Sequence, residues 1–515
     1  MSGFYKYAEA EPDFVAVVEP DGTEVRAGDL LARANQYVHL LRSLGLEKGD
    51  SVAAVLPNGV KPVEVYLAAL QAGWYYVPIN YRLSAPEIAY IIQDAGAKAI
   101  VSHERYAPVI SAAADEAGVP SDARLAHGSV PGFRDVEAAL AGHPSTLPDA
   151  RAAGAAMHYT SGTTGKPKGV KRKLSDFDPD VMAELFTGFF SLFGIPHRED
   201  QVHLCTSPNY HTAVTTFAGN ALNSGHRVVF MDKWDPEQTL AKIEQYQVTH
   251  THMVPTQFHR MLQLPEDVRN KYDVSSMMWA IHAAAPCPID VKQKMLDWWG
   301  PVIWEYYGAT EGGGTTATPQ DWLKYPGTVG RPWAISELKV SDDDGAAVAP
   351  GVPGTVWMKM GGQDFEYKGD KSKTDENHDA DGFFTVGDIG YLNEDGFLFL
   401  CDRKSDMIIA GGVNIYPAEI EGEILAHPGV GDVAVFGIPD DDMGEQIKAV
   451  VEPAPGEQPG DELRASIMSH IEGRLAKFKW PKSIDFVDEL PREPTGKLLK
   501  RQLRDPYWEG RDRAI

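Results

Sequence analysis

A short polar stretch, "TSGTTGKPKG" from Thr160 to Gly169, carries the residue types that bind an anion. Its hydroxyl side chains and glycine amides can surround phosphate oxygens while its lysines supply positive charge. The members of this set are Thr160, Ser161, Gly162, Thr163, Thr164, Gly165, Lys166 and Lys168. The stretch is not a Walker loop, because Pro167 follows Lys166 where that motif has Ser or Thr. Its composition predicts a polyphosphate-binding loop, with a flexible linker as the alternative.

The composition is that of a folded, acidic protein. Of the 515 residues, 43% are hydrophobic and 23% are charged, and the formal net charge is −25. Nonspecific nucleic-acid binding normally needs a basic surface that displaces counterions from phosphate, so the charge argues against it. Any anion must therefore bind at a local basic site.

The three cysteines and the N-terminus bear on the compartment. Cys205, Cys287 and Cys401 form no CxxC pair, which argues against a zinc site and a disulfide framework and fits a reducing compartment. The N-terminal stretch has no cationic start followed by an apolar run, so no signal peptide is expected. No segment reaches the roughly eighteen uncharged apolar residues that span a bilayer. We expect a cytoplasmic protein.

Helix-like and strand-like segments alternate along most of the chain. Residues 29–46 place apolar side chains at three- and four-residue intervals, and residues 51–59 have the pattern of a short buried strand. The same order repeats in residues 62–80 and 86–104 and resumes after residue 225. Such alternation is typical of α/β proteins with largely parallel strands.

The pattern changes towards the C-terminus. Between residues 341 and 400, short strands and turns such as "DDDG" and "NEDG" predict a small antiparallel unit. A helix, two strands, a long helix and a final strand follow. The predicted fold class is α/β: a large N-terminal domain of sheets flanked by helices over residues 1–402, and a small α+β C-terminal domain over residues 403–515.

Six motifs in a fixed order resemble those of one enzyme family. They are "YTSGTTGKPKG" (159–169), "YYGATEGG" (306–313), "GTVGRP" (327–332), "TVGDIGYL" (385–392), "DRKSDMIIAGGVNIYPAEIE" (402–421) and "PREPTGKLLKRQLR" (491–504). Together they resemble the adenylate-forming (ANL) superfamily of acyl-CoA synthetases, peptide-synthetase adenylation domains and beetle luciferases. The resemblance covers most of the chain and implies an active site between a large N-terminal domain and a small mobile C-terminal domain.

The resemblance implies a reaction between two anions. A substrate carboxylate attacks the α-phosphorus of ATP and gives an acyl-adenylate and pyrophosphate, so charge neutralisation and alignment are the main catalytic needs. Lys497 resembles the family lysine that reaches the carboxylate and the α-phosphate. Glu311 resembles the carboxylate that binds Mg²⁺, and Thr310 the residue that contacts the α-phosphate. For Glu311 the alternative is an acid that solvates a turn.

The nucleotide site is also implied by the resemblance. Tyr307 matches the ring that packs on adenine, Asp388 the carboxylate that accepts the ribose hydroxyls, and Arg403 a second ribose contact; a core tyrosine and a turn-capping aspartate are the alternatives. The rest of the expected ATP-binding set is Thr160, Ser161, Gly162, Thr163, Thr164, Gly165, Lys168, Ala284, Ala285, Pro286, Glu305, Tyr306, Gly308 and Ala309. Ala283 and Ala284 replace glycines of relatives, which predicts a slightly narrower floor.

The expected acyl pocket contains His211, Phe217, His282, Gly312 and Gly313. His211 matches the position that borders the carboxylate in relatives, although a lone histidine is more often structural. The glycines at 312–314 remove side-chain volume and suggest room for a bulky acyl group. The identity of the acyl group stays open.

The second half of the reaction needs an acceptor for the acyl group. In the resembled family the small domain turns about a hinge and opens a tunnel for the CoA thiol. The hinge position, usually Asp or Lys, is Ser405 here. Gly411 and Gly412 match the backbone beside the pantetheine tunnel, with a plain β-turn as the alternative.

The leading hypothesis is an AMP-forming acid–thiol ligase that uses ATP, Mg²⁺ and CoA. It would act on a hydrophobic, bulky carboxylic acid such as a fatty, steroid-like or aryl acid. Residues 207–220 lack the aspartate that aminoacyl adenylation domains usually carry, which disfavours a peptide-synthetase function. The alternatives are an enzyme that stops at the adenylate, acyl transfer to a carrier protein, oxidation of the adenylate, and a noncatalytic nucleotide sensor. A homodimer is possible.

Overall fold

The computed structural model describes residues 2–160, 167–197, 200–309, 312–361, 365–367, 377–492 and 498–510. For Thr160 and residues 365–367 it describes the backbone alone. Nine of the predicted site residues lie outside those ranges: Ser161, Gly162, Thr163, Thr164, Gly165, Lys166, Thr310, Glu311 and Lys497. Within the described ranges, no helix is both long and apolar enough to cross a membrane.

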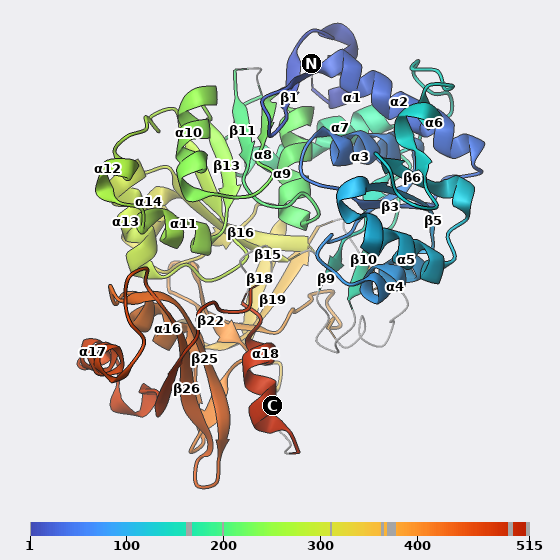
Figure 1. Cartoon of the computed structure of the whole chain (residues 1–515). Helices are drawn as coiled ribbons and strands as arrows, with labels where there is room; N and C mark the ends of the chain where they lie inside the picture. Colours follow the sequence, from blue (N-terminus) through green and yellow to red (C-terminus); the bar gives the residue numbers. More distant parts are fainter. Residues whose placement is uncertain are drawn as a thin grey trace.

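A nine-stranded sheet forms the centre of the N-terminal part (Figure 1). The strands from β15 to β1 pair in parallel, and β2, β16 and β17 add antiparallel edges. Their order is β17 (Arg331–Pro332), β16 (Gly312–Ala317), β15 (Ile303–Ala309), β14 (Trp279–His282), β13 (His250–Met253), β11 (Val202–Cys205), β12 (Arg227–Phe230), β1 (Val15–Val18) and β2 (Glu24–Arg26).

Helices bury both faces of this sheet. One face packs against α1 (Phe4–Ala10), α8 (Gly188–Ser191) and α9 (Thr212–Asn223), and α7 (Pro179–Phe186) lies beside them. The other face packs against α10 (Pro236–Tyr246), α11 (Pro255–Leu262), α13 (Ile289–Trp299) and α14 (Pro319–Lys324), with α12 (Glu266–Arg269) beside α10. The two faces therefore carry separate hydrophobic cores.

A second, six-stranded sheet is parallel throughout. Its order is β7 (Arg134–Asp135), β6 (Arg124–His127), β5 (Ala97–His103), β3 (Ser51–Val55), β4 (Tyr75–Pro78) and β8 (Ala155–Ala156). It packs with α2 (Ala27–Ser43), α3 (Val60–Ala72), α4 (Ala85–Ala95), α5 (Ala107–Ala117) and α6 (Val136–Leu140). Local signals set these helices: at α4, Ser84 and Glu87 form a capping box, and Gly96 ends the helix at φ 61°.

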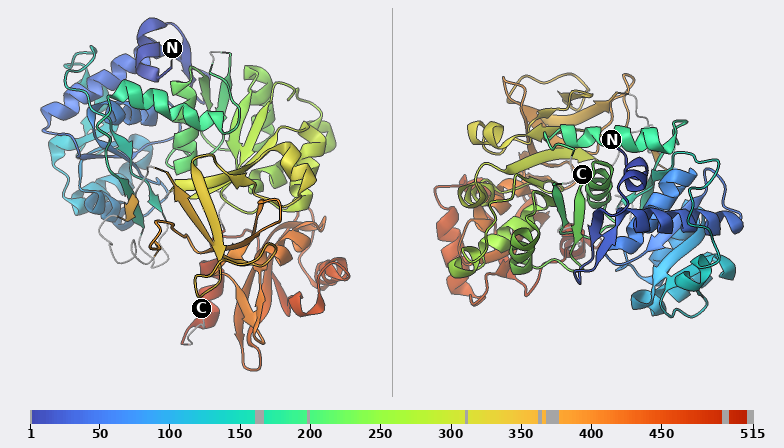
Figure 2. Two further views of the ribbon diagram at one scale, coloured as in Figure 1. Left: turned by 180° about the vertical axis from the view of Figure 1, so that it is seen from behind. Right: turned by 90° about the horizontal axis from the view of Figure 1, so that it is seen from above.

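Two small antiparallel sheets accompany the large sheets, and the one formed within residues 336–403 leads into the C-terminal part (Figure 2). One contains β9 (Tyr159–Thr160), β10 (Lys168–Arg172) and β20 (Phe365–Tyr367). The other has the order β18 (Ser336–Ser341), β19 (Gly354–Met360), β21 (Asp388–Leu392) and β22 (Leu398–Arg403). The second sheet is the antiparallel unit that the sequence predicts between residues 341 and 400.

The C-terminal part has its own core (Figure 1). Its sheet has the order β24 (Val413–Ile415), β23 (Ile408–Ala410), β26 (Gly444–Pro453) and β25 (Val430–Asp440), and β27 (Ser483–Phe486) pairs with β26. Helices α16 (Pro417–Leu425), α17 (Asp461–Ile471) and α18 (Lys500–Arg504) accompany it. The predicted α/β class, with a large N-terminal and a small C-terminal part, is confirmed; the boundary at residue 402 stays a prediction.

A chain of buried histidines crosses the nine-stranded sheet. His203 of β11 and His250 of β13 are register partners, and their Nδ1 atoms are 3.0 Å apart. His250 Nε2 lies 3.0 Å from His226 Nδ1, and His226 Nε2 lies 2.9 Å from the carbonyl oxygen of Pro196. Burial lowers the pKa of His203 to about 3 and that of His226 to about 4, and it holds the pKa of His250 well below its usual value. All three rings are therefore neutral at neutral pH.

This chain predicts a loss of stability in acid. The unfolded histidines take up protons near pH 6.5, whereas the folded ones resist protonation down to about pH 4, so stability falls as the pH is lowered between these values. His226→Asn removes one proton-binding group of the unfolded state. The pH dependence of the unfolding free energy should therefore fall by the contribution of one proton, about 1.4 kcal/mol per pH unit below pH 6. Thermal unfolding midpoints between pH 8 and pH 5 measure this. The matched control, His197→Asn at an exposed position, should follow the wild type. A midpoint that is independent of pH would contradict the prediction.

Candidate active site

The ends of the predicted phosphate loop lie on two paired strands. Tyr159 and Thr160 of β9 pair with Gly169 and Lys168 of β10. A Cβ atom at Gly169 would lie 2.9 Å from the Tyr159 ring, so glycine permits this close pairing. Tyr159 also donates a hydrogen bond to Asp94 Oδ2 at 2.5 Å, which ties the base of the loop to α4. The loop itself lies outside the described residues, and its role stays a prediction.

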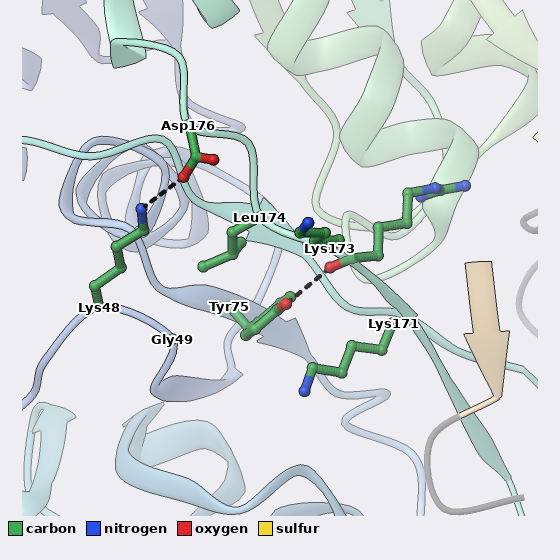
Figure 3. Close-up of a pocket in the computed structure, with 8 residues that line it drawn as sticks. Lys48, Gly49, Tyr75, Lys171, Lys173, Leu174 and Asp176 are labelled. Carbon is green, nitrogen blue, oxygen red and sulfur yellow. Dashed lines mark hydrogen bonds and ion pairs between the residues drawn. The ribbon is translucent and has the colours of Figure 1, made fainter. Parts of the chain in front are cut away.

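The chain leaves this loop along a cationic surface pocket (Figure 3). The pocket has a volume of about 590 Å³. Its lining residues are Lys48, Gly49, Tyr75, Lys171, Arg172, Lys173, Leu174 and Asp176. Tyr75 donates a hydrogen bond to the Arg172 carbonyl oxygen at 2.8 Å, and Lys48 Nζ lies 3.4 Å from Asp176 Oδ1. Sequence reasoning predicted no site here. The segment then forms α7 and α8, which bring aromatic side chains to the sheet.

Asp388 joins the predicted ribose and adenine contacts. It begins β21, its residue is 8% exposed, and it pairs across the ladder with Arg403 of β22. The Tyr307 hydroxyl of β15 donates to Asp388 Oδ2 at 2.6 Å, and Arg403 Nε lies 3.4 Å from Asp388 Oδ1. The structure thus brings together three of the predicted nucleotide-binding residues from three strands.

The Ala283–Pro286 segment follows β14 and keeps a conformation that favours glycine. Ala284 has φ 75°, in the left-handed region where a Cβ atom costs about 1–2 kcal/mol. Ala284 and Pro286 are exposed, and Ala285 is partly exposed. The alanines that replace the family glycines therefore do not remove the glycine-like backbone turn at Ala284.

Glu305 and His282 lie close together on the face of the sheet that packs against α13, and their expected roles stay predictions. They are register partners on β15 and β14, so both side chains face α13. Lys292 Nζ of α13 lies 2.6 Å from Glu305 Oε2, and His282 Nε2 lies 3.4 Å from the same oxygen. Because side chains alternate along a strand, Glu305 points away from the face that carries Tyr306. The side chains of Glu305 and His282 thus lie on the opposite face of the sheet from Tyr306 and Phe217.

His211 and Phe217 do lie on one face of the sheet, with Tyr306. Phe217 of α9 is fully buried, and its ring centroid lies 4.9 Å from that of His252 and 6.1 Å from that of Tyr306. His211 precedes α9, and burial together with the nearby His158 and His252 lowers its pKa to about 3. Tyr306 belongs to this group by its side chain and not to the Asp388 cluster.

Side chains pack against the glycines at 312–314, and the expected room for a bulky acyl group stays a prediction. A Cβ atom at Gly312 would lie 3.6 Å from Met360 Sδ, and one at Gly313 would lie 3.4 Å from Met358 Cβ. At the neighbouring Gly314 it would lie 2.7 Å from the Trp333 ring. Methionine side chains of β19 and the Trp333 ring thus lie against these glycines. Motif reasoning missed Trp333, although it directly follows the "GTVGRP" motif.

Contacts around Ser405 define the predicted hinge. Arg504 Nη1 of α18 donates to the Ser405 carbonyl oxygen at 3.3 Å and lies 3.5 Å from Asp406 Oδ1. Asp402 Oδ2, before the hinge, accepts a hydrogen bond from the Ala418 amide of α16 at 2.8 Å. One carboxylate thus connects the two sides of the hinge.

Gly411 and Gly412 form the two-residue turn between β23 and β24. Their φ values are 58° and 78°, and such left-handed pairs are typical of type I′ hairpin turns. A Cβ atom at Gly411 would lie 2.4 Å from Met443 Cε. The turn explains the glycines locally, and their predicted place beside a CoA tunnel stays a prediction.

The Asp388 cluster predicts graded effects on nucleotide use. Asp388→Ala removes the carboxylate and should raise the KM for ATP about 10-fold or more, since hydrogen bonds to charged groups contribute about 1.5–3 kcal/mol. Tyr307→Phe removes one neutral hydrogen-bond donor and should raise the KM for ATP only a few-fold. Initial rates at varied ATP concentration measure both. Tyr325→Phe, which removes a similar bond to Asp395 in the β21–β22 turn, is the matched control and should leave the KM unchanged. Equal KM values for Asp388→Ala and the wild type would contradict the assignment.

The comparisons with known proteins agree with these motifs. The chain matches the family model described as AMP-binding enzyme over residues 4–363 and the AMP-binding enzyme C-terminal domain over residues 419–497. It is 33% identical to the long-chain-fatty-acid–CoA ligase FadD13 of Mycobacterium tuberculosis over 97% of each chain. It is 31% identical to the fatty acid–[acyl-carrier-protein] ligase ScoC of Streptomyces coeruleorubidus over 99% of this chain and 96% of that one.

A solved relative is similar over the whole fold. ATP-bound MatB of Rhodopseudomonas palustris is 31% identical, with a TM-score of 0.82 over 98% of this chain and 99% of that one. The apo form of the same protein has the same identity and coverage but a TM-score of 0.73. The arrangement described here is thus more similar to the ATP-bound form. The ordered motifs, the fold and these matches agree. The chain therefore belongs to the AMP-binding enzyme family, the adenylate-forming enzymes.

Proposed function

We propose that this enzyme activates a hydrophobic carboxylic acid with ATP and then transfers the acyl group to the thiol of CoA. In the first step a carboxylate oxygen bonds to the α-phosphorus, and the bond from that phosphorus to pyrophosphate breaks. In the second step the thiol attacks the acyl carbonyl carbon, loses its proton, and AMP leaves. The observation that supports this proposal is the Asp388 cluster, in which a buried carboxylate contacts Tyr307 of the large sheet and Arg403 beside the predicted hinge. We propose that this carboxylate accepts the ribose hydroxyls.

Neutralisation of negative charge is the main contribution expected from the protein in the first step. The loop between β9 and β10 would bind the β- and γ-phosphates with its amides and with Lys168. Lys497 would reach the carboxylate and the α-phosphate. Mg²⁺, when bound, would offset phosphate charge. Glu311 is its proposed ligand, because a hard carboxylate oxygen suits this ion and the residue belongs to the same sequence motif as Tyr307.

The acceptor is supported by the relatives and by the hinge contacts. FadD13 is named as a CoA ligase, whereas ScoC is named as a ligase for a carrier protein. We propose that CoA is the acyl acceptor here. Between the two steps, rotation about Ser405 would move Lys497 away from the reacting groups and bring the Gly411–Gly412 turn towards them. The Asp402 bond to the Ala418 amide would break in that rotation, because its two ends lie on opposite sides of the hinge.

Replacement of Lys497 tests the first step. Lys497→Ala should lower ATP–pyrophosphate exchange by about 100-fold or more, as expected when a group that stabilises transition-state charge is lost. Lys477→Ala is the matched control, because this exposed lysine lies in the same part of the chain. Undiminished exchange in Lys497→Ala would contradict the assigned role. Absence of exchange in the wild type with every acid would favour a noncatalytic nucleotide sensor.

The acceptor is tested by product analysis with one activated acid. With CoA present, AMP and an acyl-CoA thioester should accumulate in equal amounts over many turnovers. Without CoA, the reaction should stop near one acyl-adenylate per enzyme. If a thioester forms only with an acyl-carrier protein, that protein and not CoA is the acceptor. Oxygen-dependent loss of the adenylate would instead indicate oxidation.

A further inference from the structure

We propose that Trp333 sets the size limit of the acyl site, so that the substrates are acids with a slender hydrophobic part: a linear chain or a single planar ring. This inference rests on the proposed function and specifies its substrate class. It replaces the expectation that residues 312–314 leave room for a bulky group. Trp333 is not among the residues that the sequence motifs predicted for the acyl pocket.

The floor of the site is a pair of strands with two small positions. Tyr306 and Gly308 of β15 lie opposite Thr316 and Gly314 of β16 in the antiparallel register. Directly paired residues, and residues two apart, share one face of a sheet. These four residues therefore form one continuous surface on the side of Phe217. Two of the four lack side chains, which leaves a depression in this surface.

The Trp333 ring fills this depression. A Cβ atom at Gly314 would lie 2.7 Å from Cζ2 of Trp333, and one at Gly308 would lie 3.6 Å from Cη2. The indole Nε1 donates to Thr316 Oγ1 at 2.8 Å, and the Trp333 amide donates to the Gly314 carbonyl oxygen at 3.0 Å. Both bonds end on β16. The indole N–H and the backbone amide of Trp333 thus both fix its position against β16.

Aromatic contacts continue from Trp333 to the predicted acyl wall. Phe189 of α8 makes edge contacts with Trp333 and Phe217, at centroid distances of 6.3 Å and 5.2 Å. Phe217 in turn contacts Tyr306 and His252. Trp333 and Phe189 thus continue the aromatic cluster that contains Phe217 and Tyr306. Aromatic packing of this kind resists displacement more than single contacts do.

The two neighbouring glycines are covered by a different kind of residue. Met358 and Met360 of β19 lie beside Gly313 and Gly312, and Met360 Sδ lies 3.2 Å from the Gly313 amide. Methionine is unbranched and repacks easily, whereas an indole ring held by two hydrogen bonds does not. The capacity of the site therefore depends on Trp333 more than on the methionines.

The test compares acids of increasing width. Pyrophosphate release is measured for linear medium-chain, single-ring aryl and polycyclic acids in the wild type, Trp333→Ala and Trp333→Phe. The wild type should prefer slender over polycyclic acids by at least about 10-fold in kcat/KM, since even one methylene contributes about 10-fold to discrimination. Trp333→Ala should reduce this ratio at least about 10-fold, mainly through a lower KM for the polycyclic acids. Trp333→Phe should reduce it less, and it keeps the test possible if the alanine variant does not fold.

Trp357→Ala is the matched control. Its indole Nε1 also donates to a hydroxyl, Ser341 Oγ at 3.0 Å, but it lies in the β18–β19 pair. The ratio of kcat/KM between slender and polycyclic acids in Trp357→Ala should equal that of the wild type. Equal activity of the wild type on slender and polycyclic acids, or an unchanged ratio in both Trp333 variants, overturns this inference alone. No pyrophosphate release with any acid overturns the proposed function and this inference with it.

Discussion

A buried carboxylate needs partners, and the partners of Asp388 come from separate parts of the fold. An unpaired charge in this position would be strongly destabilising. Tyr307 comes from the nine-stranded sheet and Arg403 from the strand that enters the hinge. The large sheet, the small antiparallel sheet and the hinge must therefore assemble together for Asp388 to be satisfied. The proposed ribose contact and the domain junction depend on the same carboxylate.

The two faces of β14 and β15 have different roles. One face carries the buried ion pair between Glu305 and Lys292 of α13. The other face carries Tyr306 and the glycine depression beneath Trp333. A strand can serve both because successive side chains point to opposite faces. The ion pair stabilises the strand whose opposite face is proposed to bind the acyl group.

Local signals in the sequence predicted much of the fold. Helix periodicity, short apolar runs and turn glycines predict elements, because each depends on residues close in sequence. The ordered motifs also predicted that Tyr307, Asp388 and Arg403 belong to one site. The faces of Glu305 and His282 could not be predicted, because they depend on the pairing of β14 with β15. Nor could the contact of Trp333 with Gly314, because Trp333 comes from the connection between β17 and β18 and reaches Gly314 only in the folded chain.

The histidine chain has a consequence for where protons reside. The Pro196 carbonyl can only accept, so His226 must carry its hydrogen on Nε2 and present a bare Nδ1. His250 must then donate from Nε2, and His203 must donate from Nδ1 to the bare Nδ1 of His250. A single backbone oxygen at the sheet margin thus dictates the tautomer of three successive imidazoles, and gives the interior of the sheet a directional array of N–H dipoles.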